Sequence, residues 1–378
     1  MRTQLTRFAA AGLAVAMLAA CGSDDKKAAS TTAAPTTAAA APTTVAAAPT
    51  TAGGDTATTA GATEGSGGAA PAGDLKTGLT IAVIPKAINN AYFDAAFVGA
   101  QKACEELQAT CEQVGPTEAT GAAQTEFINT EIQKGVDAIV ISAADADSVT
   151  PSLQQAKAAG IAVVTYDADV NDTSARLAMI KPTTPDLIAT SQVKWISDAI
   201  GPEGGEIAIL SAAATAENQN AWIDLMKKDL AANYPKLKLV DTVYGDDDAA
   251  TSADKAAALL QAHPDLKGII SPTTVGVAAT AKYISGSEYK GKVQVTGLGL
   301  PSEMKSYLKD GTVKTVGLWD PGMLGYLGIY AAVNAVSGND LSAGFAADGK
   351  TYTPDADGIV IVGPPAEFTA DNVDQYAF

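Results

Sequence analysis

Short apolar runs alternate with amphipathic runs over most of the chain. Residues 79–84 form a nearly continuous apolar run of the kind found in strands that are buried on both faces. From Tyr92 to Leu107 the apolar residues recur at the spacing of one helix face, which predicts an amphipathic helix. The folded part of the chain is therefore expected to begin with a strand followed by a helix.

The alternation continues to about residue 296, with short turns between the elements. Further strands are expected at 138–141, 161–166, 206–210, 237–243, 268–270 and 293–296. Further helices are expected at 122–134, 149–159, 218–232, 251–262 and 275–284. Buried strands that alternate with helices predict an α/β fold whose parallel sheets are covered by helices on both faces. Because about 300 residues exceed one hydrophobic core, two such sheets are expected.

The N-terminal residues have the features of an export signal. Arg2 and Arg7 give a basic start, and the apolar run 8–17 is too short to span a membrane. The run ends in Leu18-Ala19-Ala20-Cys21, which resembles the lipobox of bacterial lipoproteins and predicts a lipid on Cys21. An ordinary signal-peptidase site beside an incidental cysteine is the alternative. We expect 1–20 to be a signal peptide and the mature chain to be extracytoplasmic, held at the membrane by lipid alone.

The segment 21–74 differs in composition from the rest of the chain. It is dominated by Ala, Thr, Pro, Gly and Ser, and Ala-Pro-Thr-Thr recurs at Ala34, Ala41 and Ala48. Such a composition cannot bury a hydrophobic core. It predicts a disordered spacer between the lipid anchor and the folded part.

The charge balance excludes several classes of partner. With 25 Lys and Arg against 42 Asp and Glu, the net charge of −17 argues against nucleic acid and against an anionic membrane surface. The chain has one histidine, His263, and no Cys/His cluster with zinc spacing, so neither a metal nor a cofactor is expected. Cys104 and Cys111 lie near the end of a predicted helix and the start of the next strand. Outside the cytoplasm they can form a disulfide, and two free thiols are the alternative.

Polar residues follow the predicted strands at the ends where parallel sheets bind ligands. These segments are 85–94, 166–169, 218–220, 271–274, 297–301 and 317–321. Asp167 can accept hydrogen bonds from two hydroxyls, and cationic or amide side chains can donate to others, which suits a polyhydroxylated ligand. The candidate donors are Lys86, Asn218 and Gln219, and the candidate aromatic contacts are Tyr92, Phe93 and Trp319.

Several of the candidate residues also have a purely structural interpretation. Asn90 either contacts the ligand or caps the helix that follows it. Tyr92 and Phe93 are alternatively core residues of that helix. Asp169 either contacts the ligand or braces a turn, and Asp320 either contacts the ligand or anchors the chain where it passes between lobes.

The order and spacing of a set of short motifs resemble the type I periplasmic sugar-binding proteins, most closely the rhamnose-binding and autoinducer-2-binding branch. The motifs are Ile84-Pro85-Lys86, Gly115-Pro116-Thr117, Thr165-Tyr166-Asp167-Ala168-Asp169, Gly317-Leu318-Trp319-Asp320 and the ending 357–378. The resemblance implies two Rossmann-like lobes joined by three crossovers, near Pro182, Leu318 and Tyr352. The implied boundaries are 77–181 plus 319–350 for the first lobe and 182–318 plus 351–378 for the second.

The resemblance also implies which residues contact the ligand. The matching positions are Lys86 and Asp167 in the first lobe and Gln219 and Pro272 in the second. Two positions depart from the autoinducer-2 branch, which has Asp and Ala where this chain has Asn218 and Thr274. Without that carboxylate, a general sugar is the leading interpretation of the ligand.

The function implied by the resemblance is capture of a small sugar between the lobes and its delivery, by a monomer, to the permease of an ABC importer. A receptor that serves a sensor kinase or chemoreceptor uses the same fold and remains an alternative, as does a structural wall lipoprotein. An enzyme on the same scaffold is disfavoured, because the chain has neither a Gly-x-Ser-x-Gly elbow nor a P-loop. Asp167 and Asp169 on one loop also cannot flank a glycosidic bond.

Overall fold

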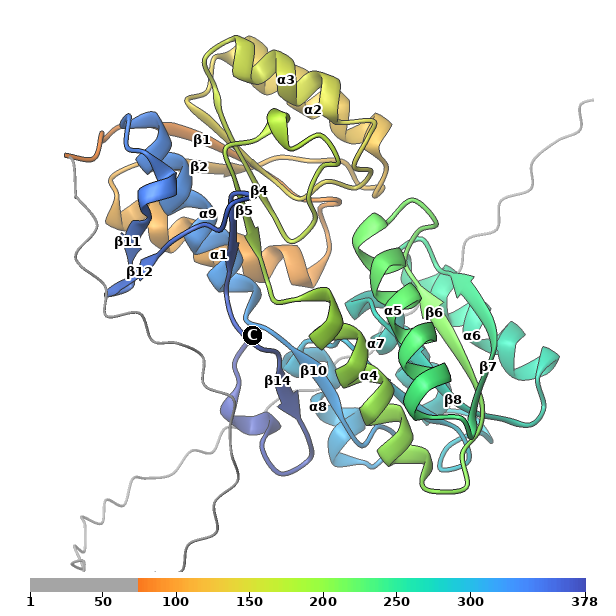
Figure 1. The fold of residues 1–378 in the computed structure, drawn as a ribbon. Coiled ribbons are helices and arrows are strands. Elements are labelled where there is room, and N and C mark those ends of the chain that lie inside the picture. Colours follow the sequence, from red (N-terminus) through yellow and green to blue (C-terminus); the bar gives the residue numbers. More distant parts are fainter. Residues whose placement is uncertain (1–73) are drawn as a thin grey trace, which may run out of the picture. The chain divides into compact units, whose positions relative to one another are not determined.

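The computed structural model describes residues 74–378 as two α/β lobes, each built on its own parallel sheet (Figure 1). This is the fold class that the sequence predicted. The predicted signal peptide, Cys21 and the spacer up to residue 73 lie outside the described residues. In the described part of the chain, no helix is both long and apolar enough to cross a membrane.

The sheet of the first lobe has the strand order β13-β5-β4-β3-β1-β2, and every neighbouring pair is parallel. The strands are β1 (Thr80–Ile84), β2 (Thr110–Gln113), β3 (Ala138–Ile141), β4 (Ala162–Tyr166), β5 (Ala178–Lys181) and β13 (Ile359–Ile361). Parallel pairing brings the carboxyl ends of these strands to one edge. The loops that follow β1, β3 and β4 therefore lie together.

Helices cover both faces of this sheet, because its strands are apolar on both sides. They are α1 (Ala91–Glu106), α2 (Gly121–Lys134), α3 (Thr150–Ala158) and α9 (Pro321–Val336). In β1, Ile81 and Val83 belong to the core shared with α1 and α9, whereas Ala82 and Ile84 belong to the core shared with α2 and α3. Figure 1 shows α2 and α3 together over the sheet, with α1 and α9 on its other side.

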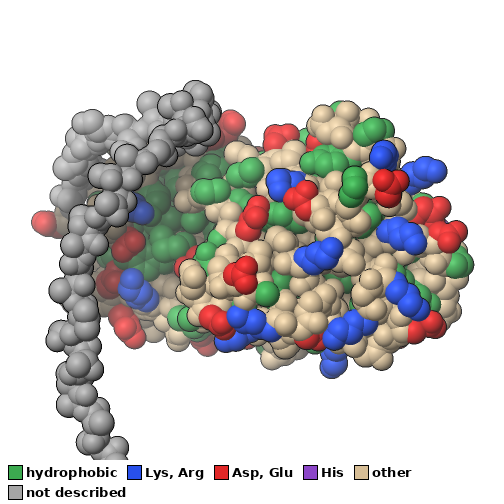
Figure 2. Space-filling view, turned by 90° about the horizontal axis from the view of Figure 1, so that it is seen from below, with side chains coloured by type: hydrophobic (Ala, Val, Ile, Leu, Met, Phe, Trp, Pro, Cys, Tyr) green, Lys and Arg blue, Asp and Glu red, His purple; other side chains and the backbone are tan. Residues whose placement is uncertain are grey.

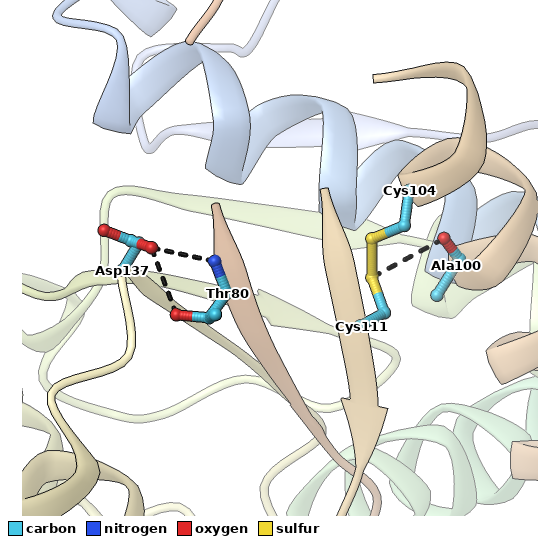
Figure 3. Close-up of a disulfide and its surroundings, with 5 residues drawn as sticks. All are labelled: Thr80, Ala100, Cys104, Cys111 and Asp137. Atoms are coloured by element: carbon cyan, nitrogen blue, oxygen red, sulfur yellow. Dashed lines mark hydrogen bonds between the residues drawn. A yellow bond between two sulfur atoms is a disulfide. The ribbon is translucent and has the colours of Figure 1, made fainter. Parts of the chain in front are cut away.

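A disulfide joins α1 to β2 (Figure 3). The Cα atoms of Cys104 and Cys111 lie 6.1 Å apart, and Cys111 Sγ lies 3.8 Å from the carbonyl oxygen of Ala100. The sequence left the bonded and free forms open, and the structure has the bonded one. Closing so short a loop stabilises the fold by about 2.5 kcal/mol on the loop-entropy estimate.

The sheet of the second lobe has the order β7-β6-β8-β9, again with parallel neighbours. Its strands are β6 (Gly205–Ser211), β7 (Leu237–Tyr244), β8 (Leu266–Ser271) and β9 (Gln294–Gly297). The covering helices pack in two pairs, α4 (Pro185–Ile200) with α5 (Glu217–Asn233) and α6 (Ala249–Ala262) with α7 (Thr274–Ser285). Beyond β9 lie α8 (Pro301–Lys309) and the antiparallel pair of β10 (Val316–Leu318) and β14 (Ala366–Phe368).

The third crossover between the lobes differs from the predicted one. The prediction assigned 351–378 to the second lobe, but β13 pairs with β5 of the first sheet, with Ile359 opposite Met179. Before it, β11 (Phe345–Ala347) and β12 (Lys350–Tyr352) form a hairpin, of which β11 packs on α9. The chain therefore enters the second lobe between β13 and β14, because a three-residue strand completes the edge of the first sheet.

The surface carries charges of both signs. Figure 2 shows acidic and basic side chains interspersed over the face that is seen from below. On this face the excess of 42 acidic over 25 basic residues in the whole chain does not gather into a patch of one sign.

Candidate ligand-binding site

One cavity is lined by loops and helix starts of both lobes. The first lobe contributes Lys86, Asn90, Tyr92, Phe93, Asp167 and Trp319, and the second contributes Asn218, Gln219, Trp222, Asp247, Pro272, Thr273, Thr274, Leu298 and Leu318. These residues lie at or just beyond the carboxyl ends of the strands. The fold thus brings together most of the positions that sequence reasoning selected.

Asp167 is the centre of a hydrogen-bond network on the first lobe. It follows β4 directly, in a left-handed backbone conformation with φ of 60°. Its carboxylate accepts hydrogen bonds from the Tyr92 hydroxyl at 2.9 Å and the Ser142 hydroxyl at 2.8 Å. Lys86 Nζ lies 3.6 Å from the same carboxylate. A buried carboxylate with these partners is held in one orientation.

Lys86 connects the two lobes. It follows the short turn after β1, is buried, and its Nζ donates a hydrogen bond to Asn218 Oδ1 of the second lobe at 3.3 Å. Lys86 is therefore not a solvated loop charge. Its ammonium group instead sits between Asp167 and Asn218 inside the cavity.

The beginning of α1 supplies an amide and two aromatic rings. Asn90 both caps the helix, accepting a hydrogen bond from the Tyr92 backbone N–H at 3.0 Å, and lines the cavity. Tyr92 and Phe93 are buried and also line it. These three residues thus serve the local structure and also line the cavity, and their contact with a ligand stays a prediction.

The Tyr92 hydroxyl relays hydrogen bonds between two cavity residues. It donates to Asp167 and accepts from Trp319 Nε1 at 2.8 Å. Burial and the neighbouring Asp167 carboxylate raise the pKa of Tyr92 well above its ordinary value. The phenol therefore keeps its proton, and both the Tyr92 and Trp319 rings are fixed at the cavity wall.

Hydrogen bonds within the second lobe orient the Gln219 side chain. Its carboxamide oxygen accepts hydrogen bonds from the Ser211 hydroxyl at 2.6 Å and from the Ala212 backbone N–H at 2.9 Å. The amide nitrogen is then the group that it can offer to a ligand. Pro272 and Thr274 line the same side of the cavity, at the turn between β8 and α7.

Two predicted site residues do not line this cavity. Asp169 is bound to Arg176, whose Nε donates to both of its carboxylate oxygens at 2.8 and 2.9 Å, and it also accepts from the Thr165 hydroxyl. Asp320 is exposed and caps α9 by accepting from the Gly322 backbone N–H at 2.8 Å. Both carboxylates make contacts that serve the local structure, which was the alternative interpretation of each. Asp169 also lines the second cavity described below, so its contact with a ligand stays a prediction.

Two lining residues, Trp222 and Asp247, lie outside the segments that the sequence singled out. Thr273, Leu298 and Leu318 lie inside those segments but were not among the selected candidates. Trp222 lies one helical turn after Asn218, so the period of α5 could have indicated it. Asp247 follows a strand that was predicted at 237–243, and inspection of every strand end would have included it.

A second cavity, of about 180 Å³, adjoins the first and shares Asp167, Asn218 and Trp222 with it. It is lined further by residues of the first crossover, among them Pro182 and Pro185. Among residues 74–378, no group of three or more His, Cys, Asp or Glu is arranged to hold a metal ion.

Comparison with known proteins identifies the family. Residues 81–340 match the model of the periplasmic binding protein domain, which is more than half of the chain. The D-apiose import binding protein of Actinobacillus succinogenes is 25% identical over 64% of this chain and 77% of its own length. The ribose import binding protein of Bacillus subtilis is 24% identical over 74% of this chain and 88% of its own length.

Solved structures agree with this match. A sugar ABC transporter protein from Actinomyces odontolyticus is 45% identical, with a TM-score of 0.64, over 79% of this chain and 98% of its own. A solute-binding protein from Clostridium phytofermentas with bound L-rhamnose is 37% identical, with a TM-score of 0.75 and the same coverage. These relatives are binding proteins of transporters, not enzymes. The chain therefore belongs to the periplasmic binding protein family, in its type I branch of sugar-binding proteins of ABC transporters.

Proposed function

We propose that this protein captures a small neutral sugar between its lobes and delivers it to the permease of an ABC importer. The observation that carries the proposal is the cavity itself, where acceptors and donors from both lobes meet beside aromatic rings. Asp167 and Lys86 face it from the first lobe and Gln219 faces it from the second. No single lobe offers all of these groups.

The residue chemistry favours a polyhydroxylated ligand. Carboxylate and ammonium groups form charge-assisted hydrogen bonds with hydroxyls, and an amide nitrogen donates one more. The rings of Tyr92, Trp222 and Trp319 supply apolar faces for the C–H groups of a sugar. A ligand that lacks the hydroxyls leaves buried polar groups unpaired, which is the source of selectivity.

Binding is expected to be coupled to opening and closing of the lobes. The cavity is about 40 Å³ in this conformation, well below the roughly 150 Å³ of a cavity known to bind benzene. We therefore expect the lobes to separate for a sugar to enter and then to close on it with contacts from both sides. Since the ligand is satisfied only between both lobes, it shifts the population toward a closed form that a permease can recognise.

L-Rhamnose is the first ligand to test, and AI-2 is the second. The relative from Clostridium phytofermentas has L-rhamnose bound and is 37% identical to this chain. LsrB from Clostridium saccharobutylicum, in complex with AI-2, is 30% identical with a TM-score of 0.75 over 79% of this chain and 100% of its own. Asn218 and Thr274 depart from the autoinducer-2 branch, so we place the sugar ahead of AI-2.

A screen by thermal shift tests the proposal directly. The full mature chain is heated with L-rhamnose, D-ribose, D-allose, D-arabinose or AI-2, each in large excess. A ligand that binds only the folded state at 100 times its Kd stabilises it by about 2.7 kcal/mol, which raises Tm measurably. Calorimetric titration then gives the affinity, and absence of binding by every sugar contradicts the proposal.

We further propose that lipid on Cys21 holds the protein outside the cytoplasm at the cell membrane. The support is the lipobox-like Leu18-Ala19-Ala20-Cys21 after a short apolar run. Cys21→Ser is expected to move the protein from the membrane fraction to the soluble fraction. Retention of the Cys21→Ser protein in membranes after a high-salt wash contradicts lipid anchoring.

A further inference from the structure

Asp247 lines the cavity from a loop that no motif indicated. It lies between β7 and α6, in the run Gly245-Asp246-Asp247-Asp248. Backbone hydrogen bonds from Gly245 to Ser211 at 2.8 Å and from Asp246 to Ala212 at 3.0 Å tie this loop to the end of β6. Asp248 caps α6. The loop is therefore fixed on both sides of Asp247.

The backbone of the loop is held in an unfavourable conformation. Asp246 has φ of 55° and Asp247 has φ of 51°. Both values lie in the left-handed region, which residues other than glycine occupy at an energetic cost. Such costs are concentrated at functional sites. Asp167, the central carboxylate of the first lobe, has the same feature, with φ of 60° directly after its own strand.

The Asp247 carboxylate has fewer partners than Asp167. The Thr273 hydroxyl donates one hydrogen bond to its Oδ1. Within residues 74–378 it forms no ion pair, whereas Asp167 pairs with Lys86. A half-buried carboxylate with one neutral donor keeps unused acceptor capacity. Because the residue lines the cavity, that capacity is directed where a ligand would lie.

The cavity as a whole has more negative than positive groups. Its charged side chains are Lys86, Asp167 and Asp247. Burial raises the pKa of the Asp247 carboxyl. The hydrogen bond from Thr273 and the positive charge of Lys86 lower this pKa, whereas the negative charges of Asp167 and Asp246 raise it further. An anionic ligand would add a further negative charge near two carboxylates, which is unfavourable in a partly desolvated site.

We propose that Asp247 is a second ligand-binding carboxylate, which accepts a hydrogen bond from a ligand hydroxyl or ammonium group on the side of the second lobe. The inference rests on the proposed function and narrows it. The ligand presents hydrogen-bond donors to the carboxylates of Asp167 and Asp247 from two opposite sides. Sugar acids are therefore excluded as ligands. Asp247 thus selects neutral or cationic polyhydroxylated ligands over anionic ones.

Asp247→Asn with Asp246→Asn as its matched control tests this assignment. Both substitutions remove one negative charge from the same loop, but Asp246 is exposed and does not line the cavity. Asparagine keeps the oxygen that accepts from Thr273, so the loop is expected to stay intact. Affinity for the sugar that binds the wild-type protein most tightly is measured by calorimetry, and the Tm of each ligand-free protein is measured in parallel.

We expect Asp247→Asn to weaken sugar binding about tenfold or more, since a hydrogen bond to a charged group is lost, and Asp246→Asn to stay within about twofold of wild type. The ligand-free Asp247→Asn protein should melt at or above the wild-type Tm, because a half-buried charge that forms no ion pair within residues 74–378 is removed. D-Glucuronate should not bind the wild-type protein.

Three results overturn the assignment. They are unchanged affinity of Asp247→Asn, a fall in its ligand-free Tm that accompanies the loss of affinity, and binding of D-glucuronate as tight as that of the neutral sugar. A fall in Tm would assign Asp247 a structural role instead. If the wild-type protein binds no sugar at all, the proposed function itself fails, and this result is distinct from the three above.

Discussion

Each lobe places one aspartate in the cavity, and the two aspartates are held differently. Asp167 of the first lobe receives hydrogen bonds from Tyr92 and Ser142 and lies 3.6 Å from Lys86 Nζ. Asp247 of the second lobe receives one hydrogen bond, from Thr273. The first carboxylate is therefore part of a network that also maintains the fold of its lobe. The second keeps most of its capacity for a ligand.

This comparison separates two kinds of site residue. A residue embedded in a network contributes to binding by positioning its neighbours, and its removal also damages the structure. A residue with few partners contributes mainly through the ligand and reduces the stability of the ligand-free protein. Mutations in the two lobes should therefore have different signatures in affinity and in stability.

The largest effect is expected for Asp167→Ala. It removes the acceptor of two hydroxyls and the counter-ion of Lys86, so sugar affinity should fall more than a hundredfold and the ligand-free Tm should also fall. Calorimetry measures the sugar affinity, and thermal melting measures the ligand-free Tm. Unchanged affinity would show that Asp167 is not at the ligand, and unchanged Tm would remove the contrast with Asp247→Asn.

Loss of the disulfide should affect stability without affecting the site. The double substitution Cys104→Ser and Cys111→Ser removes a bond at the far end of α1 from the Asn90 cap, and about 2.5 kcal/mol should be lost, which lowers Tm by a few degrees. Sugar affinity should stay within twofold. A large loss of affinity would instead show that this end of the first lobe is coupled to the cavity.

Tryptophan fluorescence can report on ligand binding from both lobes. Trp319 of the first lobe and Trp222 of the second line the cavity with ring centroids 6.2 Å apart, whereas Trp195 lies in the core on α4. Saturating sugar should change the emission of the wild-type protein. The change should persist in Trp195→Phe and be reduced in both Trp222→Phe and Trp319→Phe. A signal that depends on Trp195 would place the response outside the cavity.

The smallest effect concerns pH and the stability of Asp247→Asn. Burial raises the pKa of the Asp247 carboxyl in the folded state, so ionisation of this group costs stability once the pH passes above that pKa. The Tm advantage of Asp247→Asn should therefore be present near pH 7 and vanish below about pH 4, where aspartate is protonated in both states. An advantage that is the same at both pH values would contradict an ionised Asp247.

Sequence reasoning found the first-lobe half of the cavity more completely than the second-lobe half. Lys86 and Asp167 follow strands with strong apolar runs, so their position at a strand end was readable. Asp247 follows a strand end of the same kind, but its three successive acidic residues look like an ordinary solvated loop. The feature that distinguishes Asp247 from a solvated loop residue is its hydrogen bond with Thr273. This bond joins residues 26 positions apart in the sequence.

Asp169 and Asp320 were predicted to contact the ligand, but neither lines the cavity that holds Asp167. Both residues carry a carboxylate in a segment that follows a strand. The Asp169 carboxylate accepts hydrogen bonds from Arg176, and the Asp320 carboxylate accepts one from the backbone at the start of α9. A helix cap is a local feature, and the sequence indicated one at Asn90. The pairing of Asp169 with Arg176 depends on how the β4–β5 connection folds back, which periodicity does not show.

The sequence by itself determined much of the alternation of strands and helices, and with it the α/β class and the strand ends at which a ligand can bind, whereas the two lobes were implied by the family resemblance. The alternation and the strand ends follow from the local period of apolar residues, which each segment carries in its own composition. The tertiary structure alone decided that β13 joins the first sheet, which carboxylates face the cavity, and which of them is left with acceptor capacity. Such outcomes depend on partners far apart in the chain, and only packing of the complete fold brings those partners together.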